Sequence, residues 1–257
     1  MHAWTAFPQP DEFCFDAESL ATHWQRLHAG DAEPLPQDPG MLQAWVLFHN
    51  GRFQEAAQAG LKAGGAGVTA ANKATAIYAA YLEKKEKTRL DLFTAVAQRA
   101  QKQAAQEPNN PNAWYWQAYA LGRYSQGISV AKALAQGLGS QVKEALEKTI
   151  TLQPKHADAR VALAVFHAEV IDKVGSLIGG MTYGTKKEVG LKLFQEALKI
   201  NPDSPISMIE CANGILMLEG DKKISEATRL YEQASAIKPM DAMEWLQVQL
   251  AKAELAE

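Results

Sequence analysis

The chain has 257 residues, of which 47% are hydrophobic and 21% charged. It is therefore long enough for one large domain or two small ones with a sizeable core, and a largely disordered or collagen-like chain is excluded. The formal net charge of -3 provides no basic excess for binding nucleic acid. The spacing of the two cysteines, Cys14 and Cys211, is neither that of a disulfide framework nor that of a zinc motif. Cys211 stands among apolar residues and is predicted to be buried.

The first 40 residues differ from the rest in charge and proline content. They carry seven acidic residues against the single base Arg26, and five of the eleven prolines. We expect residues 1–68 to be an acidic, proline-rich lead with atypical helices that cap residues 69–257 and form one continuous domain with them. No signal peptide is visible and no run of 18 apolar residues could span a membrane. We expect a cytoplasmic protein, or a periplasmic one if a signal peptide preceded this sequence.

Apolar residues recur at three- and four-residue steps along the chain, which predicts helices, and no window alternates with the period of a strand. In chain order, helices are expected near 16–29, 39–50, 53–63, 70–86, 88–106, 111–125, 128–152 with a break at 137–139, 156–177, 186–200, 204–219, 223–237 and 241–255. The predicted fold class is all-α.

Three segments share a pattern in which apolar and small residues at helical spacing are followed by proline. They are residues 146–154, 194–202 and 231–239, and a fainter copy ends at Pro108. Each has the spacing of the end of an amphipathic helix that the proline stops. The residues expected to cap the helices that follow are Asn109, Asp203 and Asp241.

The prolines that end these segments lie 46, 48 and 37 residues apart, compared with the 34-residue period of the tetratricopeptide repeat (TPR). The residues that fit the repeat pattern are Trp114 and Ala118, Leu163 and Ala164, Cys211 and Ala212 in the first helices, and Gly190 and Ala227 in the second helices. Over residues 86–257 the chain thus resembles a TPR protein with two long insertions and one short one. The resemblance implies a right-handed superhelical α-solenoid of helix pairs, with long intra-repeat insertions and a C-terminal capping helix.

Two groups of TPR proteins are remotely similar in the order of their helix pairs and in the turn at Thr182, Tyr183 and Gly184. One is the regulator of microtubule dynamics family of eukaryotes. The other comprises the bacterial TPR proteins associated with TRAP-type periplasmic solute transporters, and this resemblance implies a ligand-holding cleft in the periplasm.

A glycine-rich insertion occupies residues 173–185 and has glycine at 175, 179, 180 and 184. Its apolar residues, Leu177, Ile178 and Met181 among them, predict that it is packed. It could be a tight connection between helices, a loop that gates a ligand or a phosphate cradle, although the spacing of a P-loop is missing.

In the TPR pattern the concave face is lined by fixed places of the first helices. Those places and their expected neighbours give seven candidate groove or ligand-binding residues: Tyr115, Tyr119, Arg123, Glu169, Tyr183, Glu210 and Asn213. The alternative is that Arg123 pairs with Glu169 or Glu210 only to tie helices together. The mixed aromatic and aliphatic lining does not fit a clamp for the acidic tails of chaperones, and it favours an apolar or mixed ligand.

The sequence contains no HExxH, GxSxG, CxxC or P-loop motif. We therefore expect no enzyme activity, no catalytic residue, no metal site and no cofactor. The leading hypothesis is a non-catalytic TPR scaffold or adaptor that binds a protein segment or peptide in its concave groove. The alternatives are a transport-associated TPR protein that binds a small molecule and a structural module that self-associates, so a homo-oligomer is left open.

Overall fold

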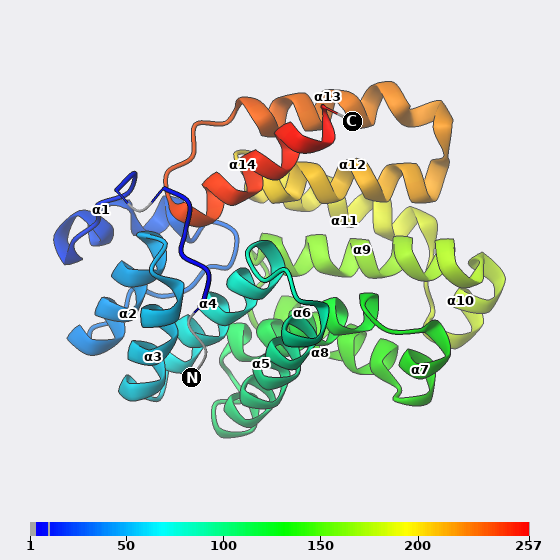
Figure 1. Cartoon of the computed structure of the whole chain (residues 1–257). Coiled ribbons are helices and arrows are strands. Elements are labelled where there is room, and N and C mark those ends of the chain that lie inside the picture. Colours follow the sequence, from blue (N-terminus) through cyan, green and yellow to red (C-terminus); the bar gives the residue numbers. More distant parts are fainter. Residues whose placement is uncertain (1–3, 10, 257) are drawn as a thin grey trace. The chain divides into compact units, whose positions relative to one another are not determined.

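The computed structural model describes residues 4–9 and 11–256, which form helices and no strand (Figure 1). Two compact units are present. Unit 1 comprises the described residues up to 28 together with 33–152 and 240–243, and unit 2 comprises 29–32, 153–239 and the described residues from 244. Within the described ranges, no helix has both the length and the apolar character needed to cross a membrane.

Unit 1 is built from helix hairpins. Its helices are α1 (Ala17–Leu27), α2 (Pro39–His49), α3 (Phe53–Ala63), α4 (Gly67–Tyr81), α5 (Glu86–Gln106), α6 (Pro111–Gln126), α7 (Val130–Ala135) and α8 (Leu138–Leu152). The pairs α2 with α3, α4 with α5 and α6 with α8 pack together, and α2, α4 and α6 lie side by side. Residues before 68 thus contain a complete helix pair, and residue 68 itself lies within α4.

Unit 2 continues the same hairpin pattern. Its helices are α9 (Ala157–Val174), α10 (Ser176–Tyr183), α11 (Lys187–Ile200), α12 (Pro205–Glu219), the short 3-10 turn η1 (Asp221–Lys223), α13 (Ile224–Ala236) and most of α14 (Ala242–Glu254). The pairs are α9 with α11 and α12 with α13, and α9 lies against α12. Their apolar stripes meet in one core around Phe194, Cys211 and Ile215, so each pair covers the apolar face of the next.

The predicted helix ranges agree with the structure within a few residues, with two exceptions. The predicted helix 70–86 is α4 at Gly67–Tyr81, and the predicted helix 156–177 ends as α9 at Val174, so that most of α10 lies outside any predicted helix. Two of the three predicted N-caps differ by one residue, whereas Asp241 directly precedes Ala242, the first residue of α14. Asn110 and Ser204, rather than Asn109 and Asp203, accept hydrogen bonds from the first backbone N–H groups of α6 and α12. Both helices have proline as their first residue, where its fixed φ fits and its missing N–H is not needed. The residue before that proline is therefore the cap.

The two cysteines differ in burial and are expected to differ in reactivity. Cys14 is exposed and Cys211 is buried, and burial, with a contribution from Glu226, raises the pKa of Cys211 to about 12. Because the thiolate is the reactive form, we expect iodoacetamide at pH 8 to modify Cys14 and leave Cys211 intact in the folded protein. Peptide mass spectrometry checks this, with the urea-unfolded chain, in which both cysteines react, as the control. Equal modification of the folded protein would contradict it.

Candidate functional site

Three of the seven candidate residues form a strip along one face of α6, because positions four residues apart share a helix face. The ring centroids of Tyr115 and Tyr119 lie 6.1 Å apart, and the guanidinium carbon of Arg123 lies 5.3 Å from the centroid of the Tyr119 ring. Arg123 also donates a hydrogen bond to Gln126. Tyr115 is buried at 5% exposure, whereas Tyr119 and Arg123 are partly exposed. The outer part of the α6 strip therefore consists of an aromatic ring with a cation stacked on it.

The other four candidate residues lie in unit 2, where each has partners. Glu169 on α9 pairs with Lys173 at 3.3 Å, and the ring of Tyr183 stands edge-on to that of Phe166. On α12, Asn213 accepts a hydrogen bond of 2.6 Å from the hydroxyl of Tyr231 on α13.

Burial raises the pKa of Tyr231, and the carboxylates of Glu254 and the candidate Glu210 act in the same direction. The structure thus groups Tyr115 with Tyr119 and Arg123, and it places Glu210 and Asn213 around Tyr231. The convergence of all seven residues on one groove stays a prediction.

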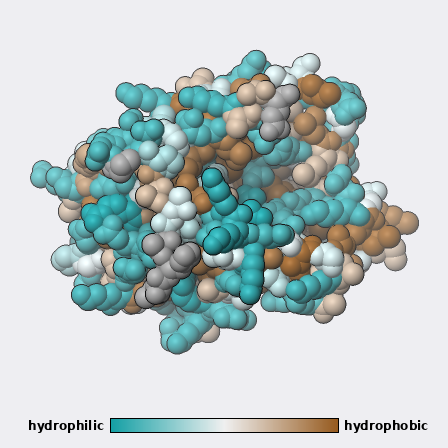
Figure 2. Space-filling model, in the orientation of Figure 1, coloured by the Kyte–Doolittle hydropathy of each residue, from teal (hydrophilic) through white to brown (hydrophobic). Residues whose placement is uncertain are grey.

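The glycine-rich insertion is a helix, α10, which packs on α9. A Cβ at Gly179 would lie 2.6 Å from Thr185 Oγ1 and 2.9 Å from Val170 Cγ1, so the glycine side of α10 is the side in close contact. The expectation that the apolar residues are packed is wrong for Leu177, Ile178 and Met181, which are 75%, 58% and 81% exposed. Figure 2 shows hydrophobic surface at the edge of the molecule where Figure 1 places α10, in agreement with the exposure of these residues.

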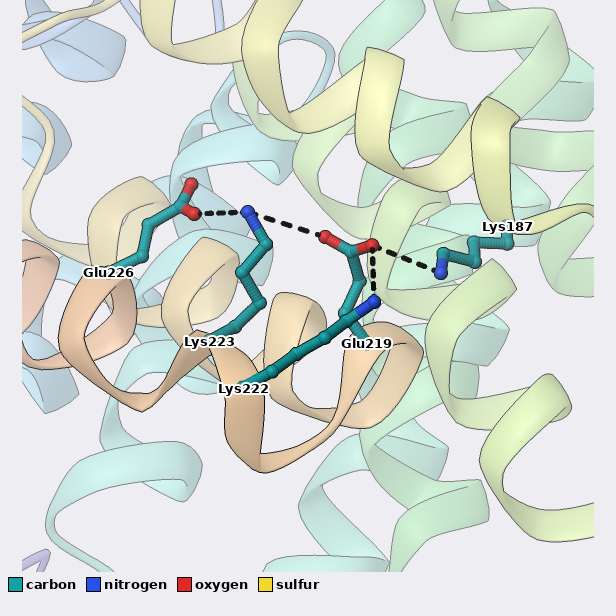
Figure 3. A network of polar contacts seen from close by, with 5 residues as sticks. All are labelled: Lys187, Glu219, Lys222, Lys223 and Glu226. Atoms are coloured by element: carbon teal, nitrogen blue, oxygen red, sulfur yellow. Dashed lines mark hydrogen bonds and ion pairs between the residues drawn. The ribbon is translucent and has the colours of Figure 1, made fainter.

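A polar network on the surface of unit 2 connects the start of α11 with the turn between α12 and α13 (Figure 3). The Glu219 carboxylate forms an ion pair with Lys187 Nζ at 3.0 Å. Lys223 Nζ forms ion pairs with Glu219 at 3.6 Å and with Glu226 at 2.7 Å. The hydrogen bond from Lys187 is the main cause that lowers the pKa of Glu219. The hydrogen bond to Glu226 is the main cause that raises the pKa of Lys223. Because these groups are solvated, each pair contributes little stability. The network lies at the turn between α12 and α13, and its charges pair with one another.

Two features of unit 1 were not found from the sequence. One is a buried polar cluster in which His49 contacts both Asp241 and His28. The other is the N-terminal segment, which packs along α3 and α4 through Trp4 and Phe7. The residues that meet are far apart in the sequence, and no motif spacing marks them. In the described part of the chain, no group of three or more His, Cys, Asp or Glu side chains is placed to hold a metal ion.

Comparison with known proteins gives a match in structure alone. No family model and no curated protein matches the chain. A crystal structure of a thermophilic TPR protein from Thermus thermophilus matches with a TM-score of 0.58 and 15% sequence identity, over 83% of this chain and 97% of that chain. The protein has a TPR-like fold. At this identity the likeness shows the fold, an α-solenoid of helix pairs, and the two remote family resemblances stay hypotheses.

In the TPR-like pattern, the second helix of each pair has a small residue where it contacts the first helix, and Gly190 and Ala227 stand at this position as predicted. A Cβ at Gly190 on α11 would lie 3.2 Å from His167 Cβ and 3.5 Å from the carbonyl oxygen of Ala164, both on α9. Ala227, the corresponding residue of α13, is 2% exposed. These residues let the second helix of each pair approach its first helix closely, which supports the TPR register.

Proposed function

We propose that this TPR-like protein is a non-catalytic scaffold that binds an extended protein segment against the α6 strip. The observation that carries the proposal is the position of the Arg123 guanidinium over the partly exposed ring of Tyr119. TPR-like folds typically bind protein segments and typically lack catalytic activity, and the faces of their first helices, of which α6 is one, line the groove. The sequence contains no HExxH, GxSxG, CxxC or P-loop motif, which agrees with this function.

The α6 strip also favours a particular kind of segment. Tyrosine and arginine are enriched among the residues that dominate protein interfaces, because they combine a large apolar surface with directed hydrogen bonds. An arginine over an aromatic ring places a planar cation at the surface, and its positive charge favours carboxylate and carbonyl oxygens in a bound segment. We therefore expect a segment with an apolar side chain for Tyr119 and an acidic or carbonyl group for Arg123.

The test is selection of binding peptides from a displayed library, followed by titration of the selected peptides against the protein. Replacing Tyr119 and Arg123 together by alanine is expected to weaken binding at least about tenfold, since two central interface residues are lost. Tyr124→Ala is the matched control, because Tyr124 is a partly exposed tyrosine on a different face of α6 and packs near Lys132. Equal binding by the folded double variant would show that the α6 strip is not the site.

A further inference from the structure

The N-terminal strap, residues 4–9 and 11–15, crosses unit 1 without forming a helix before α1 begins, and the Glu12 N–H donates to the Gln9 carbonyl oxygen in a turn (Figure 1, dark blue). The Trp4 ring stacks on that of Tyr78 in α4, with centroids 4.2 Å apart and planes 13° from parallel. Phe7 is buried at 5% exposure and lies edge-on to Phe53 at the start of α3. Two aromatic residues three positions apart therefore anchor the first part of the strap.

The surface under the strap, here called the strap site, consists of Asn50, Gly51, Phe53, Gln54 and Tyr78. Its polar side chains bind the backbone of the strap. Gln54 Oε1 accepts the Trp4 N–H at 3.0 Å, and the Tyr78 hydroxyl accepts the Thr5 N–H at 3.3 Å. Further along, Asn50 contacts both the N–H and the carbonyl oxygen of Phe15, at 2.7 and 2.9 Å.

Gly51 makes room for the Phe7 ring. Its φ is +77°, and a Cβ there would lie 2.6 Å from Phe7 Cδ1. Hydrogen bonds to the peptide backbone, together with pockets for side chains at a fixed spacing, are how proteins bind extended peptides. The strap site thus has the features of a peptide-binding site, and the chain's own strap occupies it.

The strap is attached in a way that permits exchange. In residues 4–9, Phe7 is buried, Trp4 is partly exposed, and Thr5, Ala6, Pro8 and Gln9 are exposed. Residues 4–9 lie on α3 and α4 and belong to neither helix, so they can leave their site without opening these helices, and segments with little buried apolar surface open at low free energy.

We propose that the strap site is a second peptide-binding site, separate from the α6 strip, and that the strap is its intramolecular ligand. The partner is an extended, uncharged segment of another protein that carries tryptophan and phenylalanine three residues apart, as Trp4 and Phe7 are. A strap held at millimolar effective concentration competes with that segment. The site is therefore available to a partner in proportion to the fraction of molecules in which the strap has left it.

The experiment uses a fluorescently labelled peptide with the sequence of residues 1–9 and the full chain. The chain with Trp4→Ala and Phe7→Ala keeps the strap site but loses the two anchors of the strap. We expect saturable binding of the peptide to this variant by fluorescence anisotropy, and binding at least about tenfold weaker to the native chain, in which the strap competes. Adding Gln54→Ala to the variant is expected to weaken binding, because the acceptor for the Trp4 N–H is lost.

A peptide with alanine in place of both aromatic residues is the control, and it tests recognition without changing the protein. Circular dichroism verifies that the variant chain is folded. The single variant Trp4→Ala, which changes a partly exposed residue, replaces the double one if that does not fold. The proposal is overturned if the folded variant binds no native peptide, binds the alanine peptide equally well, or binds no better than the native chain. A concentration-dependent dimer of the native chain that the double variant loses, seen by light scattering, would also overturn it, since the occupant would then be a second copy.

Discussion

Replacing His49 with alanine is expected to lower the free energy of unfolding by about 3–5 kcal/mol, the range found when a buried carboxylate loses a close partner. His49 ends α2 and is fully buried, and its Nδ1 lies 2.6 Å from Oδ2 of Asp241, which is 1% exposed. Its Nε2 lies 3.2 Å from Nε2 of His28. Both ring nitrogens of His49 are thus in use.

The large effect has two causes. The two ring nitrogens of His49 contact the Asp241 carboxylate and His28 Nε2, so its removal takes a close partner from each of two buried polar groups. The ring also fills space beside Phe48 and Trp45, with centroids 5.0 and 6.0 Å away, and its loss leaves a cavity. The pair joins residues 192 positions apart, so it anchors the returning segment 240–243 to α2 within unit 1.

Urea unfolding followed by circular dichroism measures this effect. His23→Ala is the matched control, because His23 is exposed and its Nδ1 contacts only the local backbone oxygen of Ser19 among the hydrogen bonds seen for it. That change is expected to stay within about 0.5 kcal/mol, as is usual for surface positions. A loss below about 1 kcal/mol for His49→Ala would mean that the buried pair is not a principal source of stability.

The helices could be predicted because the signal for a helix is local. An apolar stripe at three- and four-residue steps must be buried against a neighbour, and proline and glycine mark where it stops. The same periodicity placed Tyr115, Tyr119 and Arg123 on one face of α6. It failed at α10, where four glycines in ten residues lower helix propensity and the contact with α9 is made by Gly179 instead of by the large apolar residues.

Contacts between distant residues carry no such local signal. Asn50 binds the backbone of Phe15, which lies 35 positions away in the sequence. The Tyr78 hydroxyl accepts a hydrogen bond from the backbone N–H of Thr5, 73 positions away. Nothing in the spacing of these residues distinguishes them from other polar residues in loops and helices. The strap site and the His49–Asp241 pair therefore became visible only when the fold brought their members together.

A second large effect is expected where α3 and α4 touch. In Gly60→Ala, the new Cβ would lie 2.4 Å from the carbonyl oxygen of Gly67 and 2.9 Å from the backbone nitrogen of Ala71. These are backbone atoms, so the clash can be relieved only if the two helices move apart. We expect a net loss of about 1–2 kcal/mol, because overpacking of this kind costs up to about 3 kcal/mol and alanine gains only roughly 1 kcal/mol over glycine inside a helix.

Gly122→Ala isolates the helix-propensity part of this balance. Gly122 lies inside α6, and a Cβ there would meet no atom within 4 Å, so the change is expected to stabilise the protein by about 0.5–1 kcal/mol. The added methyl group meets backbone atoms in Gly60→Ala and no atom within 4 Å in Gly122→Ala. Urea unfolding of both variants measures the change in the free energy of unfolding at each position. Similar stabilisation by both would show that α3 and α4 do not require glycine at their contact. Opposite signs would show that backbone contact between these helices, and not glycine's cost within a helix, determines which residue position 60 accepts.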